Sequence, residues 1–521
     1  MKKELQALDK EKIVNINTFK QLRQEIKAKG LTITHCHGVF DLLHPGHIEH
    51  LKQAKSLGDI LVVSVTAAPF VNKGPGRPHF SDDQRMQSLA ALACIDYVVL
   101  SEFPTADMVI DAIQPDLYVK GKEYSELEND VTGAIEHEIS RVQSYGGEVH
   151  FTDGDVFSST KLLNNNFPVF PPGIREFIQE FSKHYSFDDV RTAVEQMRSV
   201  NVLVVGDIII DQYVFCEIQG LMTKDRGLSA RYSREEHYLG GSLAVARHMA
   251  NFSDNVTVCG IMGKELEFHR LLFDSMGRTT NLELVYDDAV RTVVKRKYLE
   301  RRGIRNEYEK VFSINYLAEG ESAIEPSVRQ VFYDKLDKLT QAYDLVVVSD
   351  YGHGLFDQQA MDIIRNKSRY TALNCQTNSS NYGTNLITKY TQADTFTLDE
   401  VELRLALSDK TSPVEELLSR LMIRLQAKTI WATLGSKGCM SIDSDLSIEQ
   451  FPALTLNVQD TVGAGDAFYA LSSLCAYTGQ PACLGSFLGN IAGALAANVI
   501  GNSKSVAKSD LLKFAATMLN F

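Results

Sequence analysis

Two short segments of the chain combine residue types and spacings that suit chemistry at phosphorus. Residues 35–47 read HCHGVFDLLHPGH and hold four of the 13 histidines, while residues 460–466 read DTVGAGD. Imidazoles and main-chain amides at a turn can stabilise a phosphoryl group, and an aspartate can accept the proton of an attacking hydroxyl. Both segments therefore indicate phosphate-binding sites.

The histidine-rich segment follows a predicted strand and precedes a helix that we expect to start at Pro45. The N-terminus of a helix offers free N–H groups and positive potential, and His44 and His47 are spaced to face one ligand there. Two other interpretations stay open. The imidazoles could bind a metal, although no second cluster of ligands with convincing spacing is present, or they could be capping and core residues. We favour the phosphate site.

The second segment precedes AFYALSSLCAY, which has a helical pattern. The small residues Gly463, Ala464 and Gly465 let main-chain amides approach a phosphoryl group, and the helix dipole reinforces them. Asp466, at the end of the turn, can then accept a hydroxyl proton. A GxG turn alone would be weak, but the complete motif is more specific.

A parallel sheet must position these motifs, and the chain shows the matching pattern. Apolar, β-rich runs alternate with helical patterns, one of which (residues 81–93) is typical of a helix capped by Ser81. The predicted strands of the first block are 31–36, 59–66, 96–100, 116–120 and 148–152. This alternation predicts a doubly wound α/β fold with ligands at the carboxyl ends of the strands.

A proline-rich segment, NNNFPVFPPG (164–173), marks the predicted boundary between two α/β domains. A helical bridge (roughly 174–199) leads to a new buried strand, NVLVVGDIIID (201–211). The predicted organisation is a first domain over 1–166, a linker and bridging helix over 167–199, and a second domain over 200–521.

Bulk composition limits the partners and the compartment. The 521 residues carry a net charge of −13, which argues against nucleic acid or an anionic membrane as a partner. No stretch approaches the roughly 18 apolar residues of a membrane-spanning helix. The segment MKKELQALDKEK lacks the apolar run of a signal peptide, and the eight cysteines form no CxxC pair. We therefore expect a cytoplasmic protein.

The first motif also carries a family resemblance. GVFDLLHPGH resembles the signature of the HxGH nucleotidyltransferases, especially their cytidylyltransferase-like branch. Further matches follow in order: AKSLGD (54–59), RP (77–78), QRM (84–86), YVKG (118–121) and SSTK (158–161). The resemblance implies a Rossmann-like domain in which a phosphate monoester attacks the α-phosphorus of a nucleoside triphosphate and expels pyrophosphate.

The same resemblance implies site residues. His44 and His47 would stabilise the pentavalent α-phosphate, and Lys73 and Arg77 would close over the phosphates as mobile cations. Arg85 and Lys120 would add fixed positive charge, and Ser159 and Thr160 would donate at a helix start. The other nucleotide-binding positions are Gly38, Phe40 and Asp41, the last of which either contacts the nucleotide or structures the loop.

The second motif resembles the signature of the ribokinase-like sugar kinases, which implies a second α/β domain of that type. Asp466 would be the base, the amides of Ala464 and Gly465 the anion hole, and Asp211 in VVGDIIID (204–211) a ligand of a sugar hydroxyl. Other matching positions are the substrate-site diglycine Gly240–Gly241, VVVSDYGHG (346–354) beside the sugar, Gly435 in the nucleotide-binding turn TLGSKG (433–438), and Asn490 bordering the adenine.

Three positions depart from the kinase pattern. Ala244 stands where the family usually has Asn, and Asn374-Cys375-Gln376 replaces an Asp-Pro-Lys. The usual N-x-x-E near the magnesium shell appears as Asp399-x-x-Glu402, which keeps oxygen ligands. A lost charged hydrogen bond costs about 1.5–3 kcal/mol, enough to alter sugar specificity without abolishing the chemistry.

Together, the two halves resemble the bifunctional heptose kinase–nucleotidyltransferases of ADP-heptose synthesis, with the domains in reversed order. The resemblance implies phosphorylation of a heptose phosphate by ATP, nucleotidyl transfer from CTP or ATP to a sugar 1-phosphate, Mg²⁺ held mainly by substrate phosphates, and a homodimer through the kinase domain. Two alternatives stay open: a polyol-phosphate cytidylyltransferase with a polyol kinase, and a nucleotidyltransferase joined to a non-catalytic sugar-sensing or dimerisation module.

Overall fold

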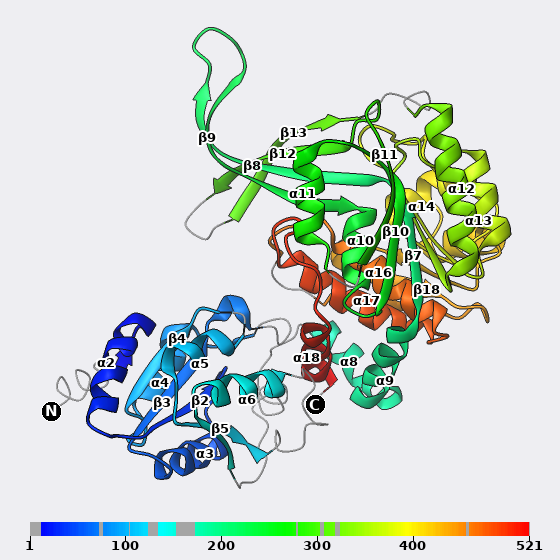
Figure 1. Cartoon of the computed structure of the whole chain (residues 1–521). Helices are drawn as coiled ribbons and strands as arrows, with labels where there is room; N and C mark the ends of the chain where they lie inside the picture. Colours follow the sequence, from blue (N-terminus) through cyan, green and yellow to red (C-terminus); the bar gives the residue numbers. More distant parts are fainter. Residues whose placement is uncertain are drawn as a thin grey trace. The chain divides into compact units, whose positions relative to one another are not determined.

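The computed structural model describes residues 12–71, 77–103, 105–122, 134–152, 172–277, 280–302, 307–317, 324–454 and 458–519. They fall into two compact units (Figure 1). The first unit comprises the residues up to Lys183 and those from Leu512 onward, and the second comprises His184–Leu511. The predicted domain limits (1–166, 167–199 and 200–521) stay predictions.

The first unit is built on a fully parallel six-stranded sheet with the order β1-β4-β3-β2-β5-β6. Its strands are β1 (Ile13–Val14), β2 (Ile33–Gly38), β3 (Ile60–Thr66), β4 (Tyr97–Ser101), β5 (Leu117–Gly121) and β6 (Glu148–Thr152). Its helices are α2 (Ile16–Ala28), α3 (Pro45–Ser56), α4 (Asp82–Ala90), α5 (Asp107–Ile113), α6 (Ala134–Ser144) and most of α8 (Pro172–His184), with a 3₁₀ turn at Ala68–Phe70 and the end of α18 (Lys508–Leu519).

Alternating side chains of the buried strands divide this sheet between two cores. In β3, Val63 and Val65 pack with Leu51 of α3 and Met86 of α4, whereas Val62 packs into the opposite core with α2 and α5. Helices thus cover both faces, as predicted, since strands buried on both sides are continuously apolar. The chain order reverses at β2, which lies between β3 and β5, and such switch points place ligands beyond the strand ends.

The second unit contains a nine-stranded sheet in the order β11-β10-β7-β14-β15-β16-β17-β18-β19, in which only β18 runs antiparallel to its neighbours. These strands are β7 (Asn201–Gly206), β10 (Asn255–Gly263), β11 (Thr280–Asp287), β14 (Leu345–Asp350), β15 (Thr371–Cys375), β16 (Thr395–Asp399), β17 (Thr429–Thr433), β18 (Cys439–Ile442) and β19 (Ile448–Phe451). A second sheet, β13-β12-β8-β9, comprises β8 (Ile208–Leu221), β9 (Leu228–Gly241), β12 (Val293–Arg302) and β13 (Glu307–Tyr316).

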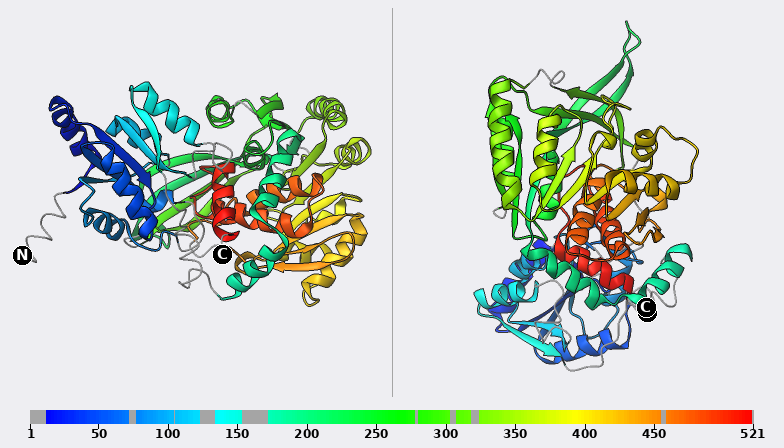
Figure 2. Two further views of the ribbon diagram at one scale, coloured as in Figure 1. Left: turned by 90° about the horizontal axis from the view of Figure 1, so that it is seen from below. Right: turned by 90° about the vertical axis from the view of Figure 1, so that its right-hand side faces the viewer.

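Helices pack on both faces of the large sheet (Figure 2). The α-helices of this unit are α9 (Phe187–Gln196), α10 (Ser242–Met249), α11 (Leu266–Ser275), α12 (Pro326–Ala342), α13 (Gln358–Lys367), α14 (Glu400–Leu407), α15 (Val414–Leu425), α16 (Ala464–Tyr477) and α17 (Ala482–Ala497), and 3₁₀ turns lie at Met197–Ser199, Ile387–Lys389 and Gly435–Lys437. One core joins the sheet to α12–α15, and on the other side α16 packs against α10 and α17. Helices α16 and α17 are buried nearly all round, which explains their continuous apolar sequences.

The single strand predicted over 201–211 is wrong. The chain leaves the large sheet after Gly206 and enters the small sheet at Ile208, so the segment forms two strands in two sheets. Asp207, between them, is buried, and its carboxylate accepts a hydrogen bond from the Tyr351 amide at 2.9 Å. A continuous apolar run hides such a break because both strands are buried.

Strands β8 and β9 form a long hairpin that projects from the second unit (Figure 1). Its pairing slips twice, between Phe215 and Cys216 and again between Ile218 and Gly220. Asp211 lies in the regularly paired part of the hairpin, which is the end that meets the rest of the unit.

None of the helices in the described ranges combines the length and apolarity that a bilayer crossing requires.

Candidate functional sites

The histidine motif has the predicted strand–turn–helix setting. Helix α3 begins at Pro45, and His44 is its N-cap, with Nδ1 accepting from the His47 amide at 3.3 Å. The two imidazole rings stack with centroids 3.8 Å apart. Burial lowers the pKa of His44, and an Nδ1 that accepts leaves the proton of the neutral ring on Nε2. The structure therefore brings both predicted histidines together at a helix N-terminus.

Close packing shapes the turn before these histidines. Phe40 has a positive φ of 48°, unusual for a bulky residue, and its ring packs edge-on to His47 with centroids 5.4 Å apart. A β-carbon at Gly38 would lie 3.1 Å from the Phe40 ring, so glycine allows this approach. Gly38 and Phe40 support the histidines from the strand side.

Asp41 structures the loop, one of its two predicted roles. Its carboxylate accepts from the amides of His79 and Phe80 at 2.7 and 3.0 Å and pairs with the Arg77 guanidinium at 3.0 Å. The Arg77 side chain is only 2% exposed, and its predicted closure over the phosphates as a mobile cation stays a prediction. Lys73, Ser159 and Thr160 lie outside the described residues.

Arg85 and Lys120, the two cations predicted to add fixed positive charge, also have partners within the first unit. Arg85 is buried and donates to the carbonyls of Val39 and Thr66 at 2.6 and 2.9 Å. Lys120 pairs with Glu138 at 2.7 Å. Arg85 therefore fixes the turn that carries the histidines, and a role of either cation on phosphate stays a prediction.

We expect Arg85→Met to lower the stability of the first unit by about 3 kcal/mol, because two carbonyls lose their donors and Asp82 loses its partner, which lies 2.5 Å away. Denaturant unfolding of the full chain, followed by a probe in this unit, measures the change. Lys20→Met, at an exposed position of α2, is the matched control and should leave the midpoint in place. Equal midpoints for the two variants would contradict the structural role.

Two further histidines, for which the sequence analysis predicted no role, contact the same hydroxyl group. His35 Nε2 and His37 Nδ1 both contact the Ser64 hydroxyl, at 2.8 and 2.7 Å. Burial lowers the pKa of His37 to about 3, so its ring is neutral near pH 7. The i, i+2 spacing in β2 was the available signal, because alternate residues of a strand face the same side.

In the second unit, Asp466 lies in the first turn of α16, whose N-cap is Gly463 with φ 84°. A β-carbon at Gly463 would lie 2.0 Å from Asn502 Oδ1, so only glycine fits there. A β-carbon at Gly465 would meet no atom within 4 Å, so space is open at that residue, whereas the Ala464 amide donates to the Thr461 carbonyl at 3.3 Å. The anion hole formed by the amides of Ala464 and Gly465 stays a prediction.

A second carboxylate, Asp211, lies across from Asp466 on the small sheet. Its Oδ1 pairs with Lys297 at 2.7 Å, and a β-carbon at Gly240 would lie 2.4 Å from its Oδ2. Gly240 therefore leaves room for this carboxylate, and Gly241, with φ 56°, is the N-cap of α10. The charge of Asp211 raises the pKa of Asp466, but burial of Asp466 raises it more.

Lysines on the small sheet are the main feature that the sequence analysis missed. Lys295, adjacent to Asp211 in the β12–β8 pairing, lies with its ammonium 5.3 Å from the centre of the Tyr351 ring. Lys310 of β13 pairs with Asp460 at 2.9 Å and so ties the start of the DTVGAGD turn to the small sheet. The basic run along β12 was visible in the sequence, but its partners depend on the sheet pairing.

Asp399 and Glu402, the predicted metal ligands, form a reciprocal capping box at α14. Asp399 accepts from the Glu402 amide at 2.7 Å, and Glu402 accepts from the Asp399 and Thr377 amides, both at 2.9 Å. Burial, and then the charge of Asp399, raise the pKa of Glu402 to about 8. Within the described ranges, no three His, Cys, Asp or Glu residues gather as a metal cluster. These two carboxylates fit at most a cation that brings its other oxygen ligands with a substrate.

The predicted nucleotide-binding positions differ in exposure. Gly435 begins a 3₁₀ turn with φ 59° and has open space around it. Asn490 is buried, and its amide donates to the Ser486 carbonyl at 3.0 Å and contacts Cys439 Sγ at 3.1 Å. Asn490 is held from within α17, and the nucleotide-binding roles of Gly435 and Asn490 stay predictions.

The substituted positions have specific partners. Asn374 donates to the Thr397 carbonyl at 2.8 Å, Gln376 donates to Asp466 at 3.1 Å, and Ala244 is buried in α10. The replaced segment thus still touches the predicted base, although without a positive charge.

One α/β unit has a pair of histidines at a helix N-terminus and the other has a glycine-rich turn there, which is the arrangement expected of a phosphate-handling class of protein. The pfkB family of carbohydrate kinases matches residues 200–507, and the cytidylyltransferase-like family matches residues 35–165. The chain belongs to the pfkB carbohydrate kinase family. The predicted fold class, a nucleotidyltransferase-like unit followed by a ribokinase-like unit, is confirmed.

Individual relatives match a smaller part of the chain. Bifunctional protein HldE of Syntrophotalea carbinolica is 40% identical over 140 residues, which are 26% of this chain and 27% of that protein. HldE of Shewanella baltica is 41% identical over 147 residues, 27% of this chain and 29% of that protein. The matched region thus spans less than a third of each relative. The crystal structure of Escherichia coli phosphofructokinase-2 with potassium is 14% identical, covers 61% of this chain and 99% of that one, and has a TM-score of 0.49.

Proposed function

We propose that the protein is a bifunctional enzyme of nucleotide-sugar synthesis, with a sugar kinase in the second unit and a nucleotidyltransferase in the first. The observation that carries the proposal is Asp466 in the first turn of α16, with open space at the neighbouring Gly465. The pfkB and cytidylyltransferase-like matches and the HldE relatives support both halves.

In the proposed kinase reaction, Asp466 accepts the proton of a sugar hydroxyl whose oxygen bonds to the γ-phosphorus of ATP. The β–γ bridging bond breaks, ADP leaves, and the amides of Ala464 and Gly465 hold the transferring group. Asp211 orients the sugar through another hydroxyl. Mg²⁺ carried by the ATP phosphates, with Asp399 and Glu402 nearby, would neutralise charge on the nucleotide.

In the proposed nucleotidyl transfer, an oxygen of a sugar phosphate bonds to the α-phosphorus of CTP or ATP, and the bond to pyrophosphate breaks. His44 and His47 hold the α-phosphate at the start of α3, where the helix dipole adds positive potential. The first reaction produces the phosphate that the second consumes, which is the chemical sense of the fusion.

The finer parts of the proposal follow from the resemblance to the heptose enzymes. We propose a heptose phosphate or close relative as the sugar, a cytoplasmic location, a homodimer through the second unit, and a domain order that reverses the usual one.

A substrate panel tests the function. The full chain with ATP and Mg²⁺ should release ADP with a heptose 7-phosphate, and pyrophosphate should form when a sugar 1-phosphate and ATP or CTP are supplied. ADP release with polyols alone would favour the polyol alternative. Tight sugar binding without ADP release would favour a sensing module.

A further inference from the structure

Both hydrogen bonds that Asp466 receives from the described residues fall on one oxygen. The Tyr351 hydroxyl and the Gln376 side-chain amide donate to Oδ1 at 2.9 and 3.1 Å. We propose that Tyr351 and Gln376 are positioning residues that occupy Oδ1 and thereby present Oδ2 of Asp466 to the sugar hydroxyl. This inference rests on the proposed kinase function, and neither residue belongs to the DTVGAGD motif.

Tyr351 is fixed along its main chain. Its amide donates to Asp207 Oδ2 at 2.9 Å, and its carbonyl accepts from the side-chain amides of Asn378 and Asn381, both at 2.8 Å. The ring is buried beneath Lys295. Hydrogen bonds to both its amide and its carbonyl fix the main chain of Tyr351, so its buried side chain can direct the hydroxyl toward Asp466.

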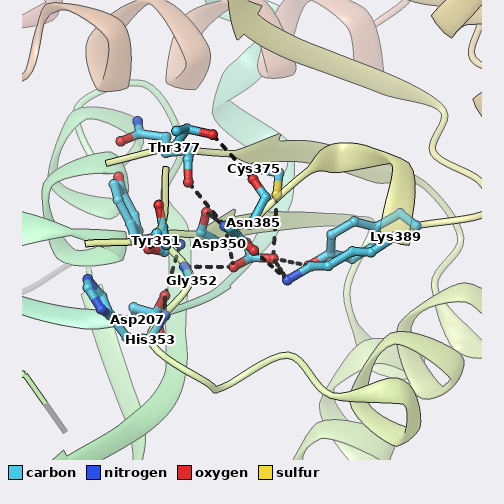
Figure 3. A network of polar contacts seen from close by, with 12 residues as sticks. Asp207, Asp350, Tyr351, Gly352, His353, Cys375, Thr377, Asn385 and Lys389 are labelled. Atoms are coloured by element: carbon cyan, nitrogen blue, oxygen red, sulfur yellow. Dashed lines mark hydrogen bonds and ion pairs between the residues drawn. The ribbon is translucent and has the colours of Figure 1, made fainter. Parts of the chain in front are cut away.

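A buried network centred on Asp350 holds the loop that carries Tyr351 (Figure 3). The Asp350 carboxylate accepts from the Gly352 amide at 2.9 Å and the Tyr390 hydroxyl at 2.8 Å, and it pairs with Lys389 at 2.5 Å. Gly352 has φ 74°, and a β-carbon there would lie 2.1 Å from Asn381 Nδ2. These contacts hold the loop through the Asp350 carboxylate and the main chain of Gly352.

Gln376 is tied to the same network. Its main-chain amide donates to the Asp350 main-chain carbonyl at 2.8 Å, and its main-chain carbonyl accepts from Asn385 Nδ2 at 3.0 Å. Asn385 also donates to Asp350 Oδ1 at 3.3 Å. The two donors to Asp466 thus come from adjacent strand ends, β14 and β15, and share one support.

The groups around Asp466 determine in which direction its pKa should change in each variant. Asp211 of β8 raises its pKa and Lys295 of β12 lowers it, and Glu402 of α14 is a further carboxylate in electrostatic contact with it. The hydrogen bonds from Tyr351 and Gln376 favour the carboxylate and lower the pKa of Asp466. Removing a donor should raise the pKa, and placing a cation at position 376 should lower it.

The experiment is a pH titration of the full chain with ¹³Cγ-labelled aspartate, in which the Asp466 signal is assigned by its loss in Asp466→Asn. We expect Tyr351→Phe to raise the Asp466 midpoint by about one pH unit and Gln376→Lys to lower it by a similar amount. The acid limb of kcat for a heptose 7-phosphate should move in the same two directions, with KM for ATP unchanged. A general loss of packing would not shift the two variants oppositely.

Midpoints that match the wild type in both variants would overturn the inference. If Tyr351→Phe fails to fold, Gln376→Lys alone decides, since its predicted shift has the opposite sign. A wild-type chain that turns over no sugar phosphate would refute the proposed function, while the titration would still decide whether these residues control Asp466.

Discussion

Asp466→Asn is expected to lower sugar phosphorylation by about 100- to 10,000-fold while leaving pyrophosphate release by the first unit unchanged. The asparagine keeps the shape of the side chain at the start of α16 but cannot accept the hydroxyl proton. Coupled assays for ADP and for pyrophosphate, run on one preparation of the full chain, measure the two activities.

The matched control for this variant is Asp274→Asn, on the exposed side of α11, which should retain both activities. Phosphorylation by Asp466→Asn near the wild-type rate would remove Asp466 as the base. Loss of both activities in a folded protein would contradict two independent sites.

His47→Ala is expected to lower nucleotidyl transfer by about 100- to 1,000-fold and to spare the kinase, because one donor to the developing charge at the α-phosphorus is lost. His47 is a cleaner target than His44, whose side chain also caps α3. Loss of a cap costs about 1 kcal/mol and would mix stability with chemistry.

Pyrophosphate release at saturating triphosphate measures the effect of His47→Ala. His137→Ala, at an exposed position of α6, controls for the removal of an imidazole. Nucleotidyl transfer at the wild-type rate in the His47 variant would exclude this histidine from the mechanism.

The sequence predicted the local framework of both sites well, because that framework depends on short-range rules. Ser81 caps its helix with a capping box, and α3 starts at Pro45 as predicted. Backbone preferences and hydrogen bonds within a few residues decide such features. The alternation of strands and helices likewise fixed the fold class.

Long-range pairing could not be predicted from the sequence. The partner of Arg77, Asp41, lies 36 positions earlier in the chain. The donors to Asp466 come from positions 115 and 90 residues away. A carboxylate next to a buried guanidinium has no local signature, since only the folded chain brings the two charges together.

The two irregularities in the β8–β9 pairing have a geometric consequence. A bulge bends the strand that carries it and increases the local twist of the pair. Both irregularities lie between the exposed tip and Asp211. The course of the outer hairpin is therefore turned away from that of its inner part, where the pairing around Asp211 is regular.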